Sequence, residues 1–506
     1  MGGTAVISSQ FVDEMAFLHL ISIYLEKGGK MINLSEGEFC SYKNLKKNFP
    51  LFMKSSGDET TPISIYYSLA GKNKFLLESI HSENEIGRYS FIGVDPYMKV
   101  RSCGNDICVE KKGSLEKVKG KVLDYIRKYL NVPYETLGLS IPFTGGAVGY
   151  VGYDIARQYE KLPDENKDDI QTPESYVMFY KKFICYDHFK HEIYFIYNFM
   201  KGDSVTYHEV EFQLEQLKNM VGRGNSFHEL EGKNAAKHVT SNVTEERYCK
   251  MVEKAREYIK AGDIFQVVLS QRLKSKSISD PFDVYRRLRS ENPSPYLFYI
   301  DFGEFKIAGS SPESLVSVKN GRVTTNPIAG TRPRGKNVKE DIKLRQELLS
   351  DEKERAEHVM LVDLGRNDIG KISEFGSINL DKFMDVGFCS HVMHIVSKVS
   401  GRLKKNLGYI DALISCLPVG TVSGAPKIRA MEIIDELENS KRGIYSGAVG
   451  YFSFNGNMDT CIAIRTILFK DGYAYVQSGA GIVYDSVAEN EYRETLNKAR
   501  AMIEVI

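Results

Sequence analysis

Two segments of this 506-residue chain each carry a pair of acidic residues three positions apart. Glu354 and Glu357 form the first pair, and Glu491 and Glu494 form the second. Residues at that spacing share one face of a helix, so each helix would present two carboxylates together. If the two faces met, the four charges would repel one another unless a hard divalent cation with oxygen ligands lay between them. Acidic pairs are more often solvated helix faces, and basic neighbours of both pairs fit that interpretation.

Three glycine-rich segments could present backbone N–H groups to a bound carboxylate. Their sequences are PIAGTRPRG (327–335), GTVSGAPK (420–427) and SGAG (478–481). The second leads into a predicted helix with Pro426 near its first turn, where a missing N–H costs little. Most glycine runs are only turns, and none of these three matches a phosphate-binding loop or a dinucleotide fingerprint.

The order and spacing of five sequence blocks are far more specific than any single motif. The blocks are PIAGTRPRG (327–335), DEKERAEHVMLVDLGRNDIG (351–370), LPVGTVSGAPKIRAMEII (417–434), RGIYSGAVGYFSFNGNMDTCIAIRT (442–466) and SGAGIVYDSVAENEYRETLNKA (478–499). Together they resemble the chorismate-binding enzymes, and the resemblance extends from Leu34 to the C-terminus. It implies an α+β fold in which two large, mostly antiparallel β-sheets pack as a sandwich with helices outside.

The resemblance also implies roles for individual residues. The positions that match the family's Mg²⁺ ligands are Glu357 and Glu494, with Glu354 and Glu491 nearby. The positions that match its chorismate-binding groups are Gly330, Thr331, Tyr445, Arg465, Gly479, Ala480 and Gly481. The positions that match its catalytic groups are Glu313, which would protonate the departing ring hydroxyl, His394, which would serve pyruvate elimination, and Thr421. Without the motif, a histidine amid valine and isoleucine would be read as a core residue.

Two positions separate the activities found within this family. Relatives that add water to the ring place a lysine base where this chain has Gln266, and ammonia needs no such deprotonation. Aminodeoxychorismate synthases use a nucleophilic lysine where this chain has Ala329. The resemblance therefore implies the large subunit of an anthranilate synthase, a lyase of tryptophan biosynthesis. The alternatives are an aminodeoxychorismate synthase component and a tryptophan-binding regulatory homologue that lacks catalysis.

Segments of the N-terminal half and of the middle resemble the family's tryptophan feedback pocket. They are LLES (76–79) with IGRYSFIG (86–93), and NPSPYLFYIDF (292–302). The resemblance assigns tryptophan binding to Ser79, Pro293, Ser294 and Pro295. The alternative is a plain strand-and-turn scaffold, because aminodeoxychorismate synthases keep a similar pocket without using it for inhibition.

The chain shows no glutaminase of its own. None of its eight cysteines lies in a GxCxG-like elbow followed by a suitable His and Glu. We therefore expect either a separate glutamine amidotransferase subunit as partner or the use of free ammonia.

The elements that must position these residues can be read from periodicity. Alternating apolar residues predict strands across 62–102, beginning at Ile63, Ile65 and Tyr67, and two aromatic-rich strands within 176–199. Strands mostly follow strands, which favours antiparallel sheets over a doubly wound parallel sheet. Helical spacing predicts helices at 206–222, 244–262, 339–364 and 423–438, with Gly262 as a C-cap. Further strands are predicted at 265–273, 296–302, 305–309, 314–318, 322–326, 447–454, 459–468 and 473–478.

Composition divides the chain and limits its setting. A polar stretch predicts a linker at 226–243, between an N-terminal domain (31–225) with the regulatory pocket and a chorismate-binding domain (244–506). Residues 1–30 are a doubtful extension, because Glu26 to Lys30 can be encoded by a ribosome-binding-like stretch before Met31; the alternative is a genuine flexible or helical extension.

Charge and cysteine usage narrow the cellular context. The net charge of +1 argues against a nucleic-acid partner, and no apolar run reaches the roughly 20 residues of a membrane span. Scattered cysteines without short-range pairs indicate reduced thiols and a cytoplasmic protein.

Overall fold

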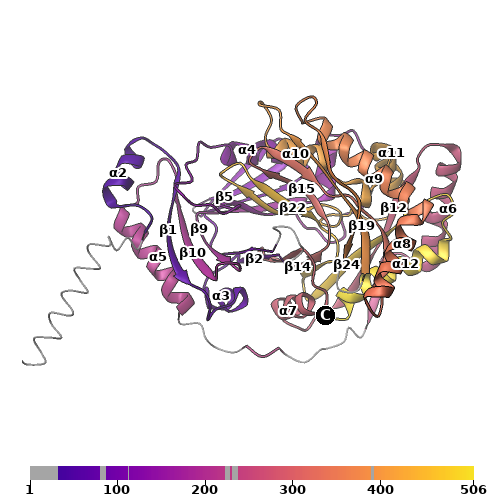
Figure 1. Cartoon of the computed structure of the whole chain (residues 1–506), viewed down its shortest axis with the longest axis horizontal. Coiled ribbons are helices and arrows are strands. Elements are labelled where there is room, and N and C mark those ends of the chain that lie inside the picture. The colour runs from indigo at the N-terminus through magenta and orange to yellow at the C-terminus, as the bar shows by residue number, and fades with distance from the viewer. Residues whose placement is uncertain (1–31, 80–86, 112, 223–227, 231–237, 389–391) are drawn as a thin grey trace, which may run out of the picture.

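Two large β-sheets dominate the computed structural model of the chain (Figure 1). The structure describes residues 32–79, 87–111, 113–222, 228–230, 238–388 and 392–506. The doubtful extension at 1–30 lies outside these ranges. Each sheet has twelve strands in the described residues, and the named strands pair antiparallel throughout. The predicted α+β class with two antiparallel sheets is confirmed.

The first sheet combines strands from both halves of the chain. In spatial order its strands are β1 (Phe49–Ser56), β10 (Glu192–Phe199), β9 (Lys182–Asp187), β3 (Tyr89–Gly93), β2 (Phe75–Glu78), β13 (Tyr296–Asp301), β14 (Lys306–Ser311), β23 (Thr466–Lys470), β24 (Tyr473–Ile482), β12 (Gln266–Lys276) and β11 (Val239–Ser241), with β20 (Gly424–Ala425) also on β12.

The second sheet is interleaved in the same way. Its strands are β17 (Ile328–Pro333), β19 (Val392–Arg402), β16 (Arg322–Thr325), β15 (Ser314–Lys319), β22 (Met458–Ile462), β21 (Ala448–Ser453), β7 (Gly146–Val151), β8 (Ser175–Tyr180), β4 (Met98–Cys103), β5 (Asp106–Lys111) and β6 (Ser114–Lys119), with β18 (Asn379–Phe388) on the other side of β19. The predicted boundary at 226–243 therefore does not separate the sheets, and β11 lies within the predicted linker.

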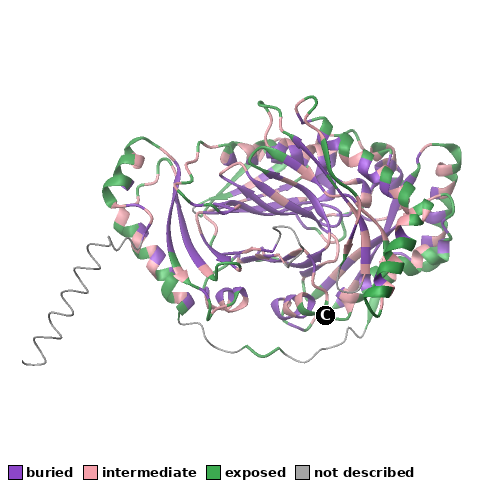
Figure 2. Ribbon diagram, viewed as in Figure 1, coloured by how far each residue is buried: buried purple, intermediate pink, exposed green. Residues whose placement is uncertain are grey.

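Helices cover the outer faces of the two sheets (Figures 1 and 2). They are α2 (Glu36–Asn44), α3 (Pro62–Ser68), α4 (Val122–Leu130), α5 (Tyr207–Gly222), α6 (Glu245–Ala261), α7 (Pro281–Glu291), α8 (Val338–Ser350), α9 (Glu352–Gly370), α10 (Tyr409–Cys416), α11 (Lys427–Leu437) and α12 (Ala488–Ile503), with short 3₁₀ turns η1 (Tyr153–Gln158) and η2 (Gly420–Val422). Between the sheets lies an aromatic core in which Phe143 packs against Phe91, Phe183 and Tyr451.

The prediction of a strand at the start of 62–102 is wrong. Residues Pro62–Ser68 form α3, because the Thr61 side chain accepts a hydrogen bond from the Ser64 N–H at 3.1 Å and Pro62 starts the first turn. The buried face of α3 places Tyr66 on Phe282 of α7, with ring centroids 3.9 Å apart. The apolar alternation there reflects a short helix in which Ile63 and Tyr67 are partly buried against the same core as Ile65 and Tyr66.

Two further boundaries differ from the sequence pattern. The aromatic stretch at 176–199 makes three strands, β8, β9 and β10, rather than two. The helix predicted at 339–364 is two helices, because Asp351 leaves helical geometry and its side chain accepts from the N–H groups of Lys353 (3.0 Å) and Glu354 (3.2 Å). This cap fixes where α9 begins and therefore where its acidic pair lies.

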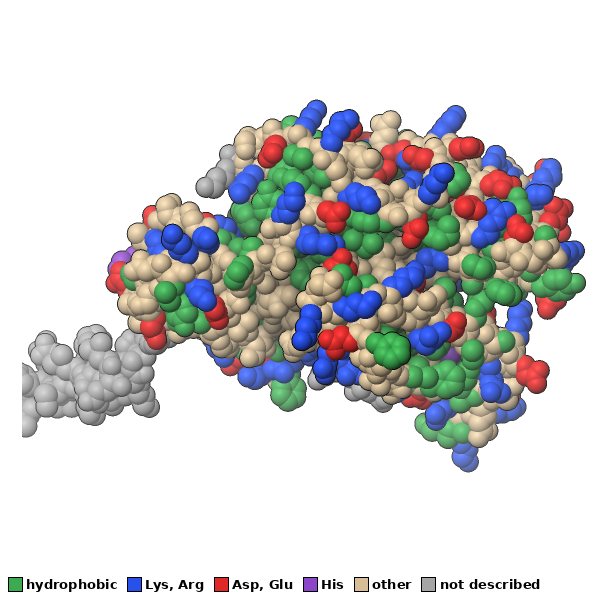
Figure 3. All heavy atoms as spheres, turned by 90° about the horizontal axis from the view of Figure 1, so that it is seen from above, with side chains coloured by type: hydrophobic (Ala, Val, Ile, Leu, Met, Phe, Trp, Pro, Cys, Tyr) green, Lys and Arg blue, Asp and Glu red, His purple; other side chains and the backbone are tan. Residues whose placement is uncertain are grey.

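The distribution of surface charge and the state of the cysteines agree with what the sequence composition predicts. Lys, Arg, Asp and Glu side chains are interspersed over the face shown in Figure 3, without a broad patch of one sign. The seven cysteines that fall within the described ranges are all free thiols. No helix in the described part of the chain combines the length and the apolar character needed to cross a bilayer.

Candidate functional site

The first acidic pair lies on α9, and each carboxylate has a donor from another element. Glu354 accepts a hydrogen bond from the Arg332 guanidinium of β17 at 3.0 Å. Glu357 accepts from Nε2 of Gln266, the first residue of β12, at 3.1 Å. Burial raises the pKa of Glu357, the Gln266 hydrogen bond lowers it, and the charge of Glu354 raises it again. The pair therefore faces inward and is held by side chains from both sheets.

The second acidic pair lies on α12 around the ammonium group of Lys498. Glu494 contacts Lys498 Nζ at 2.7 Å, and Nζ also donates to the Gly479 carbonyl oxygen at 3.1 Å. Burial raises the pKa of Glu491, and the neighbouring Glu494 charge adds to this effect. The Lys498 charge lowers the pKa of both Glu357 and Glu491. The two pairs, called the acid cluster below, therefore border one common space.

The acid cluster suits a hard divalent ion. Its donors are carboxylate oxygens, which Mg²⁺ prefers, and two of the carboxyl groups are partly buried beside a like charge. Among the described residues, no three His, Cys, Asp or Glu side chains form a preassembled metal cage. Mg²⁺ sites commonly use one or two carboxylates and take the remaining ligands from water and substrate. Glu357 and Glu494 fit that arrangement.

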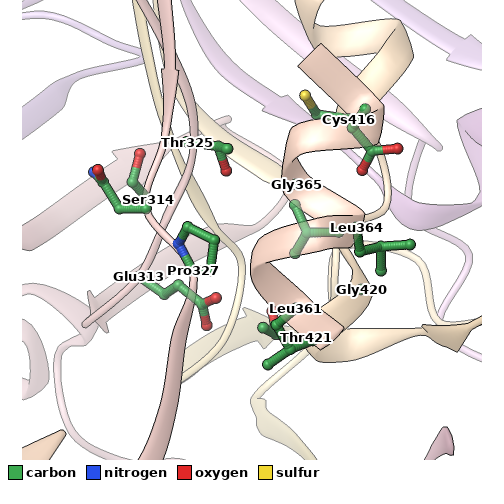
Figure 4. Close-up of a pocket in the computed structure, with 13 residues that line it drawn as sticks. Glu313, Ser314, Thr325, Pro327, Leu361, Leu364, Gly365, Cys416, Gly420 and Thr421 are labelled. Carbon is green, nitrogen blue, oxygen red and sulfur yellow. The ribbon is translucent and has the colours of Figure 1, made fainter. Parts of the chain in front are cut away.

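Glu313 occupies a very different environment in the turn between β14 and β15. Its side chain is 8% exposed, and burial raises its pKa to about 8, although Thr421 and the Lys498 charge act in the opposite direction. The Thr421 hydroxyl lies close enough to lower this pKa but makes no hydrogen bond of good geometry. Figure 4 shows the Glu313 carboxyl beside Pro327 and facing Thr421. Burial therefore makes Glu313 far easier to protonate than an exposed glutamate.

His394 on β19 is oriented by the glycine-rich segment of β17. Its Nδ1 donates to the Gly330 carbonyl oxygen at 3.0 Å and lies 3.0 Å from the Thr331 hydroxyl, which leaves Nε2 as an acceptor. Burial lowers the His394 pKa, the Gly330 hydrogen bond raises it, and the Arg465 charge lowers it. Gly330 has a φ of +65°, and a Cβ there would lie 3.0 Å from Glu354 Oε2. Glycine is required at this junction between the histidine and the acid cluster.

The predicted carboxylate site is built on β24 and the turn before β21. A Cβ on Gly479 would lie 2.8 Å from the Tyr445 hydroxyl, and one on Gly481 would lie 2.6 Å from Gln266 Nε2. The backbone can thus approach a ligand closely only because these residues are glycines. Arg465 has a φ of +47°, a conformation that is uncommon for a non-glycine residue and is found preferentially at functional sites.

The predicted regulatory residues also come together, at the adjoining ends of β2 and β13. The Ser79 hydroxyl donates to the Pro295 carbonyl oxygen at 2.6 Å. Ser294 is buried and Pro293 is half-buried, and the pairing of Glu78 with Leu297 fixes the register of the two strands. These residues contact neither acidic pair through any hydrogen bond or ion pair among the described residues.

The contacts of three side chains with the acidic pairs were not predicted from the sequence. Lys498 and Arg332 bind the carboxylates of Glu494 and Glu354, and Gln266 binds Glu357. Lys498 could have been found as the i+4 partner of Glu494 on one helix face. The other two contacts join segments far apart in sequence, which no local pattern reveals.

Comparison with known proteins gives consistent results. The model of the chorismate binding enzyme family matches residues 72–504. The chain is 48% identical over 471 residues to anthranilate synthase component 1 of Acetivibrio thermocellus, covering 90% of this chain and 95% of that protein. It is 45% identical over 454 residues to anthranilate synthase component 1 of Lactococcus lactis, covering 89% and 98%.

The fold is similar to that of a solved structure as well. The crystal structure of anthranilate synthase component I from Streptococcus pneumoniae superimposes with a TM-score of 0.75 at 43% sequence identity. The match covers 88% of this chain and 98% of that one.

Proposed function

The chain belongs to the chorismate-binding enzyme family and is one of its anthranilate-forming lyases, and we propose that its site divides the reaction between a buried acid and a neutral histidine. The substrates are chorismate and ammonia, and the products are anthranilate, pyruvate and water. The observation that carries this proposal is the burial of the Glu313 carboxyl group beside Thr421, which raises its pKa to about 8. Such a group can give a proton to a leaving hydroxyl at neutral pH.

In the first half-reaction ammonia attacks ring carbon 2 while the hydroxyl on carbon 4 departs. Glu313 donates its proton to that hydroxyl, which leaves as water. Gln266 stands where a base would be needed to deprotonate water, and an amide cannot take that proton. This side chain therefore favours amination over hydration of the ring.

In the second half-reaction the ring loses a proton and the enolpyruvyl group, and becomes aromatic. His394 is neutral, since burial and Arg465 lower its pKa. Its Nδ1–H is engaged by the Gly330 carbonyl, so the lone pair on Nε2 can accept the ring proton. The histidine thus acts after amination rather than during it.

Chorismate carries two carboxylates, and the site offers separate groups for them. Arg465 provides a planar guanidinium that suits bidentate binding, and Tyr445 and the N–H groups at 479–481 border the same space. Gly330, Thr331 and Thr421 border the ring carboxylate. Glu357 and Glu494 would hold Mg²⁺, which when bound neutralises the repulsion between acid cluster and substrate and polarises the ring.

The regulatory and partner assignments follow the same resemblance. The Ser79–Pro295 contact supports a tryptophan-binding pocket formed by Ser79, Pro293, Ser294 and Pro295. The relatives are named as components 1 of their enzyme, which supports a second component that supplies ammonia from glutamine.

A single assay tests the reaction. Purified chain is mixed with chorismate, Mg²⁺ and an ammonium salt, and anthranilate is followed by its fluorescence. Anthranilate release that depends on all three additions is the expected result. Formation of an aminodeoxychorismate that retains its enolpyruvyl group, or tryptophan binding without turnover, would instead identify one of the two alternative functions.

A further inference from the structure

A pocket lies behind Glu313, on the side formed by α9 and the second sheet. The residues that line it are Glu313, Ser314, Thr325, Asn326, Pro327, Leu361, Leu364, Gly365, Asp368, Cys416, Val419, Gly420 and Thr421. In Figure 4, Glu313 and Thr421 lie at one end and Cys416 at the other, with Gly365 of α9 between them. The pocket thus extends from Glu313 and Thr421 along α9 toward Asp368 and Cys416.

Both ends of the pocket carry polar side chains that could pass a proton. The Thr421 hydroxyl beside Glu313 is shielded from solvent and has no hydrogen-bond partner of good geometry in the protein. A buried polar atom of this kind at a polar cavity is satisfied by water. At the far end, Asp368 is 4% exposed, and Lys427 Nζ lies 2.6 Å from its Oδ2. Lys371, whose side chain is 60% exposed, lies 3.9 Å from Asp368 Oδ1 and connects this end to the surface.

Each turnover requires a proton to return to Glu313. The acid gives its proton to the departing hydroxyl, the C–O bond breaks with its electron pair on oxygen, and water leaves. The attacking ammonia becomes an ammonium substituent and must release one proton to become an amine. The step balances when the ammonium substituent releases its proton to solvent and Glu313 takes up one proton from solvent through the pocket that it lines.

We propose that the pocket behind Glu313 is a hydrated proton conduit, in which Thr421 relays protons to Glu313 and the Asp368–Lys427 pair forms the outer end. This inference rests on the proposed role of Glu313 as the acid. The conduit exchanges protons with solvent while chorismate occupies the front of the site, so turnover does not wait for product release before Glu313 is protonated again. Gly365 of α9 lines the conduit where the helix approaches Thr325 and Pro327.

Gly365 offers a way to narrow the conduit without touching the acid. A Cβ at this position would lie 3.1 Å from Thr325 Cγ2 and 3.4 Å from Pro327 Cγ, so a methyl group would narrow the pocket at its middle. Gly365 lies inside α9, where alanine is the better helix former, so the variant should fold. Gly370 ends the same helix, and a Cβ there has no neighbour within 4 Å. Gly370→Ala is therefore a matched control.

For Gly365→Ala with ammonia as nitrogen source, we expect kcat to fall about tenfold, less than the 10²–10⁴ that positioned proton transfer contributes in full. The KM for chorismate should stay unchanged, and the solvent deuterium isotope effect on kcat should rise, because proton return becomes rate-limiting. Gly370→Ala should match the wild type in all three quantities. A merely structural role for Gly365 would not raise the isotope effect.

A second variant tests the proposal independently, in case neighbouring side chains repack around the new methyl group of Gly365→Ala. Thr421→Val keeps the shape of the side chain and removes its hydroxyl. Because Thr421 also borders the ring carboxylate, the KM for chorismate should rise, but the relay role predicts in addition a higher solvent isotope effect on kcat. The proposal is overturned if Gly365→Ala equals Gly370→Ala in kcat and isotope effect, or if Thr421→Val lowers kcat with an unchanged isotope effect. Failure of the reaction assignment has another signature, since the wild type would then release no anthranilate or Glu313→Gln would be fully active.

Discussion

The site places glutamate side chains in two contrasting environments. Glu313 lies in the turn between β14 and β15 with the Thr421 side chain beside it, and burial raises its pKa to about 8. Glu357 is less buried: burial raises its pKa as well, but the Gln266 hydrogen bond and the Lys498 charge lower it, and Glu494 contacts Lys498 at 2.7 Å. Environment therefore gives one residue type two roles: a proton donor and a set of anionic ligands. Substitution of the proton donor and substitution of the anionic ligands should therefore impair the reaction in different ways.

The largest effect is expected from the anionic side. Glu357→Gln or Glu494→Gln should lower turnover by about 10³-fold. Each variant loses a carboxylate that would hold Mg²⁺, and a bound metal ion stabilises the transition state by several kcal/mol, which corresponds to a rate factor of that size. Calorimetric titration with Mg²⁺ should show weaker binding in both variants. Glu352→Gln on α9 and Glu489→Gln on α12 are matched controls, since both side chains are exposed and lie outside the acid cluster. Robust turnover of the two cluster variants in EDTA would refute the metal assignment.

The activity that depends on Glu313 should respond to pH as well as to substitution. Glu313→Gln removes the proton but keeps the shape, and should cost 10²–10⁴-fold in kcat. In the wild type the acid form is required, so activity should be full below the Glu313 pKa and fall as pH rises through about 8. The pH profile of kcat measures this limb. A rate that continues unchanged well above pH 8 would assign the proton donation to another group.

A smaller and more selective effect is expected at His394. If the histidine acts only in the elimination, His394→Ala should still aminate the ring and accumulate aminodeoxyisochorismate, detected by chromatography of quenched reactions. His208→Ala, at an exposed position on α5, is the control because that side chain is far more accessible. Anthranilate formation at the wild-type rate by His394→Ala would return His394 to the role of a core residue.

Sequence blocks supplied candidate residues for the site, but they did not reveal the contacts between those residues. The acidic pairs follow from helical spacing, and the α6 cap at Gly262 is confirmed with a φ of +84°. The interleaving of both chain halves in each sheet could not be predicted, because antiparallel pairing between distant segments leaves no local pattern. The same limit hid the contact of Gln266 with Glu357 and the pocket behind Glu313. At Pro62–Ser68 the apolar alternation predicted a strand. The residues form a helix because Thr61 and Ser64 cap its N-terminus.

Changes in the predicted tryptophan pocket should alter inhibition by tryptophan without altering uninhibited turnover. Pro295 precedes Tyr296, which pairs with Ser311 of β14, and Ser311 is two residues from Glu313. A ligand that shifts the 293–295 turn therefore acts on β14, which leads into the turn that carries Glu313. The Ser310 N–H of β14 also donates to the Arg465 carbonyl oxygen at 3.1 Å, so the shift reaches a predicted chorismate-binding residue as well. Two arrangements of this strand pair would give reciprocal coupling between tryptophan and chorismate, typically 1–3 kcal/mol or about 5–150-fold in affinity.

Ser79→Leu should break this coupling with the least effect on uninhibited turnover. The leucine removes the hydrogen bond to the Pro295 carbonyl and fills the polar end of the pocket, so tryptophan should bind more weakly and inhibit less. Binding can be measured directly, because the chain contains no tryptophan and the fluorescence of the ligand is then unobscured. Ser290→Leu, on the exposed side of α7, adds the same side chain outside the pocket and should leave inhibition unchanged. Superimposable inhibition curves for Ser79→Leu and the wild type would place the pocket elsewhere. Lost tryptophan binding with retained inhibition would mean that tryptophan acts at the chorismate site itself.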